Sequence, residues 1–566
     1  MSRNPRFLLF ILVFFAINLL LLNHSISLWD EDEAAYAGFA QHILETGNWV
    51  IPEFEWSSIH RKTPFHFWTI AVSYMVFGVN EFALRFPSCL SVFLTCFFLY
   101  YWGANVFGAA RSRLAAIVLA SSTFLPFMGK VALTDAHLLL FQTLAVLALF
   151  NYLANPNWKW NLGFWLSISL GILTKGPPIL ILTAGLWIWL AIFHPKSKRL
   201  IGTHPWIFGP LALVPTVYWG YLTYQQDGGA FLRFLYDWYI HRRIAGNIYN
   251  QTGPPGYHLL VLVLAFLTWL PFVLTSIGEV FRKFWKRAER KNESILIGGW
   301  LVFAWLFYEL MTSKLPSYSL AAQPALALLI AQQAIAFEEG SAPKHPKLFW
   351  SSFYIYLSIL FSLLIGIPLL TFAYLENEAL VYALGFSVLL GGVLFKTIPL
   401  VCRQHRLAVV HLAILGMTFS LCISIGILPI IEKTPVKQLK TVAKVAHQYQ
   451  KTFNNPKEVP LYLTGFGAKQ TKVSLLVYLS KHFKHRSNIS LSEAAEKYKN
   501  EAAGIIILAH SGYVQFKRAC SRLGIGEEHW KEKGTRVLWW SMDDKLAAHP
   551  FWIICRQCSD EHPAPE

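Results

Sequence analysis

Long apolar runs separated by short polar loops dominate the first 430 residues of the chain. Many of these runs approach 20 residues, the length that an α-helix needs to cross the hydrocarbon core of a membrane. We therefore predict an α-helical, polytopic membrane protein with about thirteen transmembrane helices. The first runs from Phe7 to about Leu22, and the others centre on residues 86–107, 112–128, 132–153, 161–174, 177–194, 205–223, 257–278, 294–312, 316–337, 348–372, 379–396 and 407–430.

The loops between these runs differ in charge. Lys and Arg gather in every second loop, for example at Arg111–Arg113 and Lys196–Arg199, and the positive-inside rule assigns such loops to the cytoplasm. This predicts a cytoplasmic N-terminus, and the odd number of spans predicts that residues after Ile430 lie in the periplasm or another exoplasmic compartment. The formal net charge is +17. Because the cations lie in short loops, we expect contact with membrane lipids and not with nucleic acid.

Two parts of the chain do not resemble membrane spans. Within residues 30–78, Tyr36–Thr46 and Phe65–Phe77 are apolar at helical spacing but too short to cross, which predicts interfacial helices on the outer surface. After residue 432 the sequence becomes polar and mixed in charge. Apolar runs at 459–464, 504–508 and 535–540 predict strands, and segments near 437–450, 491–500 and 513–522 predict helices. We expect a membrane domain, residues 1–432, and a small exoplasmic α/β domain, residues 433–566.

The seven cysteines are scattered along the chain. Cys555 and Cys558 have the spacing of redox and zinc sites, but no second pair follows them. On the exoplasmic side a disulfide, for instance one that involves Cys520, is one use of these residues. A free pair of thiols is the alternative.

Four consecutive carboxylates, residues 30–33, follow the first apolar run. Charged groups at the edge of a membrane are costly unless they meet water or take part in chemistry. A carboxylate here would orient the hydroxyl group of a substrate or take its proton. Asp30 and Asp32 would also suit a divalent cation as oxygen ligands, so a metal is compatible with the stretch but is not assigned. The alternative is an ordinary solvated loop.

The same predicted outer side carries further charged residues. Asp135 opens the fourth predicted span, either as a second acid of a site or as the N-cap of the helix. Lys62 and Lys314 would bind a phosphate at the membrane surface or extend to lipid headgroups. The remaining candidates for phosphate or substrate binding are Lys175, Arg242, Arg243 and the hydroxyl of Tyr318.

These fragments resemble one family, the polyprenyl-phosphate-sugar-dependent GT-C glycosyltransferases, and within it the bacterial aminoarabinose transferases and the protein O-mannosyltransferase-like group. The matching fragments lie in family order, and they are Asp32-Glu33-Ala34-Ala35-Tyr36-Ala37, Gly47-Asn48-Trp49, Arg61-Lys62-Thr63-Pro64, Thr134-Asp135-Ala136, Thr174-Lys175-Gly176-Pro177 and Ser313-Lys314-Leu315-Pro316-Ser317-Tyr318. The resemblance extends from residue 28 to about residue 325 and implies a membrane domain with the GT-C fold.

The resemblance also implies an activity. Such an enzyme moves a sugar, aminoarabinose-like or hexose-like, from a polyprenyl phosphate to a lipid A, glycan or protein acceptor, with inversion at the anomeric carbon. The resemblance assigns Asp32, supported by Glu33, to the activation of the acceptor, and Asp135 to substrate positioning. It assigns the lipid phosphate to Lys62, Lys314 and Tyr318. If the acceptor is itself a phosphate, no base is needed, and Asp32 would orient it.

The chain departs from the aminoarabinose transferases at three positions. Ala35 stands where they carry Arg, Arg61 stands where they carry Glu, and Thr63 replaces the first Pro of a Lys-Pro-Pro motif. A phosphate contact and a proposed metal contact are therefore missing or moved. We hypothesise that Arg61 replaces the lost cation at the phosphate.

Two other functions were weighed against this one. A polyprenyl-linked oligosaccharide polymerase or ligase would use the same kind of donor, and the sequence does not exclude it. A lipid or sugar transporter or flippase would place charges near the midplane of broken helices and would show internal repeats. Here the acids gather at one face and no repeat is evident, which favours the transferase.

Overall fold

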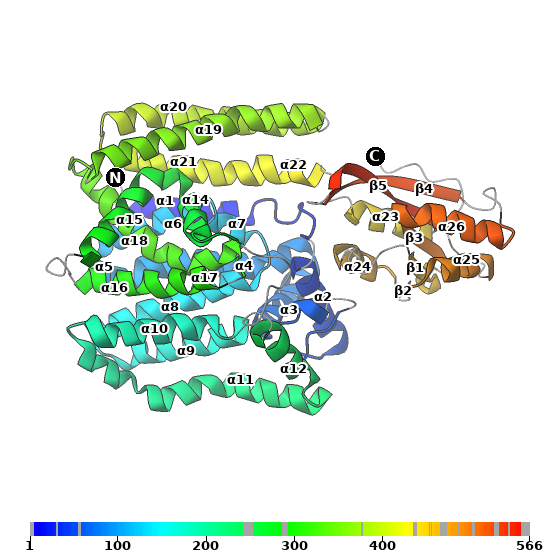
Figure 1. Ribbon diagram of the computed structural model, residues 1–566, viewed down its shortest axis with the longest axis horizontal. Helices are drawn as coiled ribbons and strands as arrows, with labels where there is room; N and C mark the ends of the chain where they lie inside the picture. Colours follow the sequence, from blue (N-terminus) through cyan, green and yellow to red (C-terminus); the bar gives the residue numbers. More distant parts are fainter. Residues whose placement is uncertain are drawn as a thin grey trace. The chain divides into compact units, whose positions relative to one another are not determined.

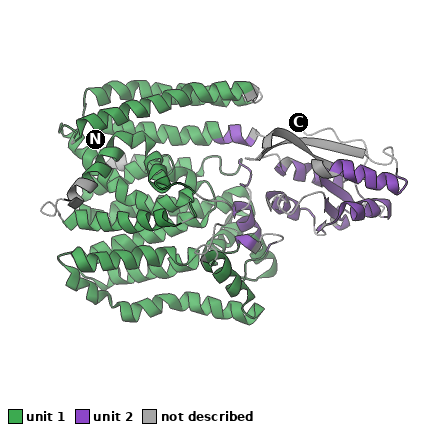
Figure 2. Ribbon diagram, viewed as in Figure 1, with its two compact units in different colours: residues 1–25, 39–53, 61–427 green, residues 26–38, 54–60, 428–566 purple. Residues whose placement is uncertain are grey.

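The computed structural model describes residues 5–29, 32–54, 58–241, 253–285, 292–311, 313–343, 345–374, 377–433, 439–451, 453, 456–464, 473–483, 486–500, 504–525, 531–541 and 544–555. The chain forms two compact units (Figure 2). Unit 1 consists of residues 1–25, 39–53 and 61–427, and unit 2 consists of residues 26–38, 54–60 and 428–566. The short stretch that carries Asp32 therefore belongs to the same unit as the C-terminal residues.

Unit 1 is built from helices (Figure 1). Its first half contains α1 (Pro5–Leu20), α3 (Phe65–Phe77), α4 (Glu81–Tyr101), α5 (Ala104–Phe107), α6 (Ala109–Ala120), α7 (Leu125–Gly129), α8 (Thr134–Ala154), α9 (Trp158–Lys175), α10 (Pro178–Phe193), η2 (Ser197–Thr203), α11 (Pro205–Asp227), α12 (Ala230–Tyr236) and η3 (Asp237–His241). Its second half contains α14 (Tyr257–Ala265), η4 (Leu267–Trp269), α15 (Leu270–Trp285), α16 (Asn292–Leu301), η6 (Val302–Leu306), α17 (Phe307–Leu310), η7 (Pro316–Ala322), α18 (Gln323–Glu338), α19 (Pro346–Tyr374), α20 (Asn377–Cys402), α21 (Ala408–Cys422) and η8 (Ile423–Ile427).

Seven helical stretches in the described residues are long and apolar enough to cross a membrane, or nine if each of two bent helix pairs is one span. The seven are Glu81–Phe107, Thr134–Ala154, Asn292–Leu310, Pro316–Glu338, Pro346–Ala373, Ala379–Cys402 and Ala408–Glu432. The bent pairs fall on the predicted spans at 205–223 and 257–278. The chain is a multi-pass membrane protein, as predicted. The count of thirteen and the orientation of the termini stay predictions.

The predicted span at 112–128 is interrupted. It folds as α6 and the short α7, separated by the polar residues Ser121, Ser122 and Thr123. The Thr123 N–H and hydroxyl donate to the main-chain carbonyl of Ala265 at 2.8 and 2.9 Å, so this N–H leaves the helical pattern of hydrogen bonds. Neither segment alone is long enough to be a candidate span in the described chain.

The helices at the two stretches predicted as interfacial have clear ends. α3 has the predicted bounds, whereas α2 (Asp32–Thr46) begins four residues earlier than the predicted Tyr36. Asp32 and Glu33 occupy its first turn, where acidic side chains interact favourably with the helix dipole. Gly47 ends it with a φ of +71°, a conformation that glycine adopts without strain. The position of both helices relative to the membrane stays a prediction.

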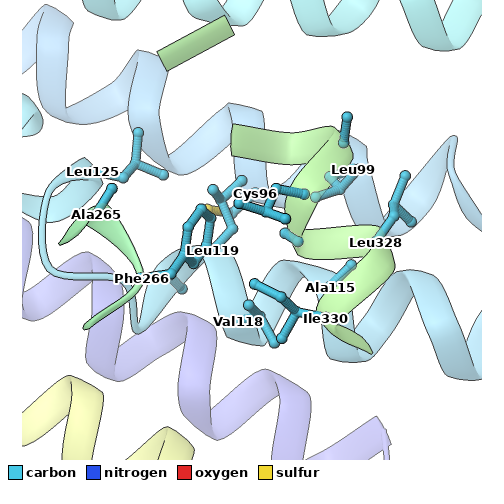
Figure 3. Close-up of a cluster of buried hydrophobic side chains, with 14 of the residues drawn as sticks. Cys96, Leu99, Ala115, Val118, Leu119, Leu125, Ala265, Phe266, Leu328 and Ile330 are labelled. Atoms are coloured by element: carbon cyan, nitrogen blue, oxygen red, sulfur yellow. The ribbon is translucent and has the colours of Figure 1, made fainter. Parts of the chain in front are cut away.

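The core of unit 1 is a large cluster of buried apolar side chains. Helix α8 lies within it, and almost all of its side chains are buried, because it is apolar around its whole circumference. Figure 3 shows another part of this cluster, where Cys96, Leu119, Phe266 and Leu328 come from segments far apart in the sequence. This packing fixes the ends of α8 and its neighbours, and the candidate site lies at one such end.

Unit 2 contains a five-stranded sheet in the order β2-β1-β3-β5-β4. Its elements are η1 (Ser58–His60), α22 (Leu428–Lys433), α23 (Leu439–Lys451), η10 (Pro456–Glu458), β1 (Leu461–Thr464), α24 (Val473–Ser480), β2 (Arg486–Asn488), α25 (Leu491–Asn500), β3 (Ile505–Ala509), α26 (His510–Arg522), β4 (Lys531–Ser541) and β5 (Asp544–Cys555). β1 pairs in parallel with β2 and β3, and β5 pairs antiparallel with β3 and β4. The small α/β fold that the sequence predicts is therefore present, with β2, β5 and α24 in addition to the predicted elements.

The cysteines of this domain do not support the disulfide that involves Cys520. Cys520 is a buried free thiol, and burial raises its pKa to about 11. Cys558 lies outside the described residues, so the pairing of Cys555 with Cys558 stays open.

Candidate functional site

An acid–base pair lies where α8 begins and α9 ends. The two helices are packed neighbours joined by residues 155–157, so the first turn of α8 lies beside the last turn of α9. The Lys175 ammonium donates to Oδ1 of Asp135 at 2.7 Å, and the two side chains are only 15% and 10% exposed. Leu133 occupies the N-cap position of α8. Asp135 therefore contacts a cation from another helix and is not the N-cap that sequence offered as its alternative role.

Three further residues complete this group. The side chain of Ser317 also forms a hydrogen bond with Asp135, and Lys62 lies close enough to interact with the carboxylate electrostatically. The Lys175 ammonium lies 5.4 Å from the centre of the Tyr318 ring, within the range of a cation–π contact. Sequence proposed four of these five residues for one site, and the structure brings them together. We call Lys62, Asp135, Lys175, Ser317 and Tyr318 the acid–lysine cluster.

A pocket opens beside the acid–lysine cluster. Its lining combines this charged group with a polar and aromatic wall, and it consists of Asp135, Leu138, Gln142, Lys175, Pro178, Tyr308, Ser317, Tyr318, Leu320 and Ala321. The rings of Tyr308 and Tyr318 lie 4.9 Å apart at 31°. Such a wall presents apolar faces together with hydroxyl donors, and a sugar ring next to a phosphate needs both.

Lys314 lies in a second group of residues, which surrounds Glu309. Its ammonium donates to the main-chain carbonyl of Glu309 and lies 3.3 Å from Oε1 of the Glu309 carboxylate. The main-chain N–H groups of Gly256 and His258 donate to the same carboxylate at 2.7 and 3.1 Å, and the Trp305 indole donates at 3.1 Å. Glu309 thus holds Lys314 and the start of α14 at one point. We call this the Glu309 group.

Asp32 lies in unit 2, with partners of its own. Its Oδ1 accepts a hydrogen bond from the Tyr36 hydroxyl at 3.1 Å and lies 3.1 Å from Nδ1 of His60. The Asp32 side chain is 46% exposed, whereas that of His60 is 11% exposed. Glu33 is buried and accepts a hydrogen bond from the Trp29 N–H at 2.8 Å, so it stabilises the start of α2. Of the two acids, Asp32 is the one that a substrate could reach.

The remaining predicted cations have different environments. The guanidinium of Arg61 lies 5.7 Å from the centre of the Phe231 ring and 3.8 Å from the Glu53 carboxylate. Arg242 and Arg243 lie outside the described residues, as does Asp30 of the suggested Asp30–Asp32 metal pair. Within the described chain no three His, Cys, Asp or Glu side chains converge closely enough to hold a metal.

Comparisons with known proteins agree with this architecture. Residues 61–219 match the dolichyl-phosphate-mannose-protein mannosyltransferase family. The structure is similar to the crystal structure of ArnT from Cupriavidus metallidurans bound to undecaprenyl phosphate, with a TM-score of 0.73 at 18% identity over 99% of this chain and 100% of the other. The apo form of that protein gives a TM-score of 0.70. This chain therefore has the GT-C fold of that protein.

The sequence is also similar to curated proteins. The chain is 28% identical over 332 residues to the undecaprenyl phosphate-alpha-4-amino-4-deoxy-L-arabinose arabinosyl transferase of Yersinia pestis (strain Pestoides F). The corresponding protein of Yersinia enterocolitica is equally similar. The match covers 57% of this chain and 58% of the length of each relative.

Three residues of the candidate site were missed from the sequence or were not given their contacts. Glu309 was not singled out, although an acid inside an apolar run is itself a signal of function. The sequence did not pair His60 with Asp32, because their approach depends on folding. Ser317 appeared only as part of a motif. The partners of His60 and Ser317 lie far away in sequence. Glu309 and Lys314 are only five residues apart, but they meet because α17 ends between them, which local spacing did not reveal.

Proposed function

We propose that this chain is a membrane glycosyltransferase that moves a sugar from a polyprenyl phosphate, such as undecaprenyl phosphate, to a lipid acceptor of the lipid A type. The acid–lysine cluster is the observation that carries the proposal, because it combines a buried carboxylate, two lysines and an aromatic pocket at a helix end. The names of the similar proteins supply the substrate class. The part of the protein that binds the acceptor would face the periplasm, and so would the C-terminal residues.

The proposed reaction needs cations more than it needs a strong base. The acceptor oxygen forms a bond to the anomeric carbon while the bond from that carbon to the phosphate oxygen breaks, and the lipid phosphate departs with the electron pair. Lys175 and Lys62 would stabilise the negative charge that accumulates on this phosphate. The hydroxyl of Tyr318 would donate to it or to the sugar.

Asp32 would act on the acceptor. Its exposure leaves the carboxylate accessible, and Tyr36 and His60 hold Oδ1 in place. For a hydroxyl acceptor, Asp32 would take the proton as a general base. For a phosphate acceptor, which is already ionised at neutral pH, Asp32 would orient the incoming group. The two donors of the experiment below distinguish an aminoarabinose-like from a hexose-like sugar, and lipid A tests the lipid acceptor.

Release of the lipid carrier tests the proposal. Purified protein in lipid nanodiscs would be mixed with undecaprenyl-phosphate aminoarabinose or undecaprenyl-phosphate hexose, with and without lipid A, and undecaprenyl phosphate would be measured by mass spectrometry. We expect acceptor-dependent release by the wild type, loss of release in Asp135→Asn and Asp32→Asn, and normal release in Glu493→Gln, which changes an exposed carboxylate. Equal release by all variants, or no release from either donor, would refute the proposal.

A further inference from the structure

The stretch that carries Asp32 forms one compact unit with the C-terminal residues. Residues 26–38 and 54–60 group with residues 428–566, although about 370 residues of the membrane unit separate them along the chain (Figure 2). Both Asp32 and its partner His60 lie in these two short pieces. Hydrogen bonds to the main chain just before α2 join the first of these pieces to the C-terminal residues.

Two residues of the C-terminal part bond to consecutive main-chain N–H groups. The N–H of Ser27 donates to the Glu432 carboxylate at 2.9 Å, and the Ser27 hydroxyl donates to the same group. The N–H of Leu28 donates to the Tyr478 hydroxyl at 2.8 Å. Ser27, Leu28 and Tyr478 are each at most 5% exposed. Buried N–H groups need such acceptors, because an unpaired one costs free energy.

The anchored segment leads directly into the helix that carries the acid. One residue after Leu28, the Trp29 N–H donates to the Glu33 side chain, and the Trp29 carbonyl accepts from the Ala34 N–H at 3.2 Å. These bonds join the Ser27–Leu28 segment to the first turn of α2, where Asp32 is the first residue. A shift of the Ser27–Leu28 main chain would therefore shift the Asp32 carboxylate relative to His60.

We propose that the C-terminal domain is a positioning element for Asp32, with Glu432 and Tyr478 as its positioning residues. The proposal rests on the glycosyltransferase function above, in which Asp32 meets the acceptor. It gives the C-terminal domain a role in turnover. It predicts that removal of the Tyr478 hydroxyl or the Glu432 carboxylate impairs the chemistry and leaves the binding of the lipid phosphate unchanged.

Single-atom variants of the full-length protein test the anchoring. Tyr478→Phe removes the acceptor of the Leu28 N–H but keeps the ring, and Glu432→Gln weakens the bonds to Ser27. Tyr498→Phe is the matched control, because Tyr498 is another buried tyrosine of the same domain. Hydrogen–deuterium exchange should be about tenfold faster in residues 26–38 of both anchor variants, with no change around Asp135. Unchanged exchange in residues 26–38 would overturn the anchoring.

Turnover and binding test the positioning role. We expect kcat to fall about tenfold in Tyr478→Phe, the size of one lost buried hydrogen bond, with unchanged affinity for undecaprenyl phosphate. In the Asp32→Glu background, Tyr478→Phe should lower kcat no further. If Tyr478 acts only by positioning Asp32, its effect depends on the native Asp32 side chain. Faster exchange with normal turnover, or an equal loss in both backgrounds, would overturn this role. Inactivity of the wild type on every donor would refute the glycosyltransferase function, and the exchange result would still decide the anchoring.

Discussion

The place of Lys314 leads to a sharp prediction. Sequence assigned this lysine to the lipid phosphate, but its side chain is only 5% exposed and its ammonium contacts Glu309. If the contact is structural, Lys314 and Glu309 form a buried ion pair. Removing one member of such a pair then harms the protein more than removing both, because the single variant leaves an uncompensated buried charge. A direct phosphate ligand would behave differently.

The magnitude follows from the contacts. Breaking a buried ion pair costs about 3–5 kcal/mol. In Lys314→Met the Glu309 carboxylate keeps three N–H donors, from Gly256, His258 and Trp305, so the lower end, about 3 kcal/mol, is expected. Glu309→Gln should cost a similar amount, since it leaves the ammonium buried. The double variant carries no buried charge and should recover at least about 2 kcal/mol relative to either single variant.

Stability and ligand binding can be measured on the wild type, the two single variants and the double variant. Unfolding by sodium dodecyl sulfate in mixed micelles gives the free energies, and titration with undecaprenyl phosphate gives the affinity. Lys159→Met, which changes an exposed lysine, is the control and should alter neither quantity. If Lys314 instead binds the phosphate, Lys314→Met should weaken binding about 10-fold or more, and adding Glu309→Gln should restore nothing. That pattern would refute the ion-pair interpretation.

Three other predictions follow from the structure. Asp135→Asn should free Lys175 and raise the affinity for undecaprenyl phosphate about tenfold while turnover falls; weaker binding of the lipid in a titration would contradict this. Gly416→Ala should destabilise the protein by about 1–3 kcal/mol, because a Cβ would come within 2.2 Å of the Ser121 carbonyl oxygen; an unchanged unfolding midpoint would be inconsistent with this close approach. Partial desolvation and neighbouring cationic side chains lower the pKa of His482 to about 4. Since the folded state binds this proton less readily than the unfolded state, the domain should lose stability as the pH falls from about 6.5 to 4, and His482→Gln should flatten that part of the unfolding profile.

Much of the architecture could be predicted from the sequence because the strongest patterns are local. Continuous apolar runs identify the spans, and α3 has the predicted ends because a polar, proline-containing segment precedes it and Gly78 follows it. The pattern failed where a tertiary contact replaces a helical hydrogen bond, as at Thr123, whose N–H donates to the Ala265 carbonyl. It also missed β5, whose sequence contains Pro550 and two adjacent alanines and shows no alternation.

The candidate site was predictable in its members but not in its pairings. Asp135, Lys175 and Tyr318 could be chosen because each belongs to a motif. The sequence could not reveal that Asp135 faces Lys175, because helix packing sets that contact. Nor could it reveal that Lys314 faces Glu309. A list of cations near a predicted membrane surface does not distinguish a cation that is available for a ligand from one that is held by a buried acid.

The pairing of Asp135 with Lys175 has a chemical consequence under the proposed function. A polyprenyl-phosphate sugar is a phosphodiester with a single negative charge, whereas the departing polyprenyl phosphate is a monoester that gains charge as the bond to the sugar breaks. An interaction accelerates a reaction only if it is stronger in the transition state than in the ground state. Lys175 is held at 2.7 Å by Asp135, so a singly charged donor competes poorly for it. The more highly charged leaving group competes better. Asp135 thus keeps Lys175 from the donor phosphate until charge develops on the leaving group. For the same reason, the Asp135→Asn variant would bind the lipid product more tightly and turn over more slowly.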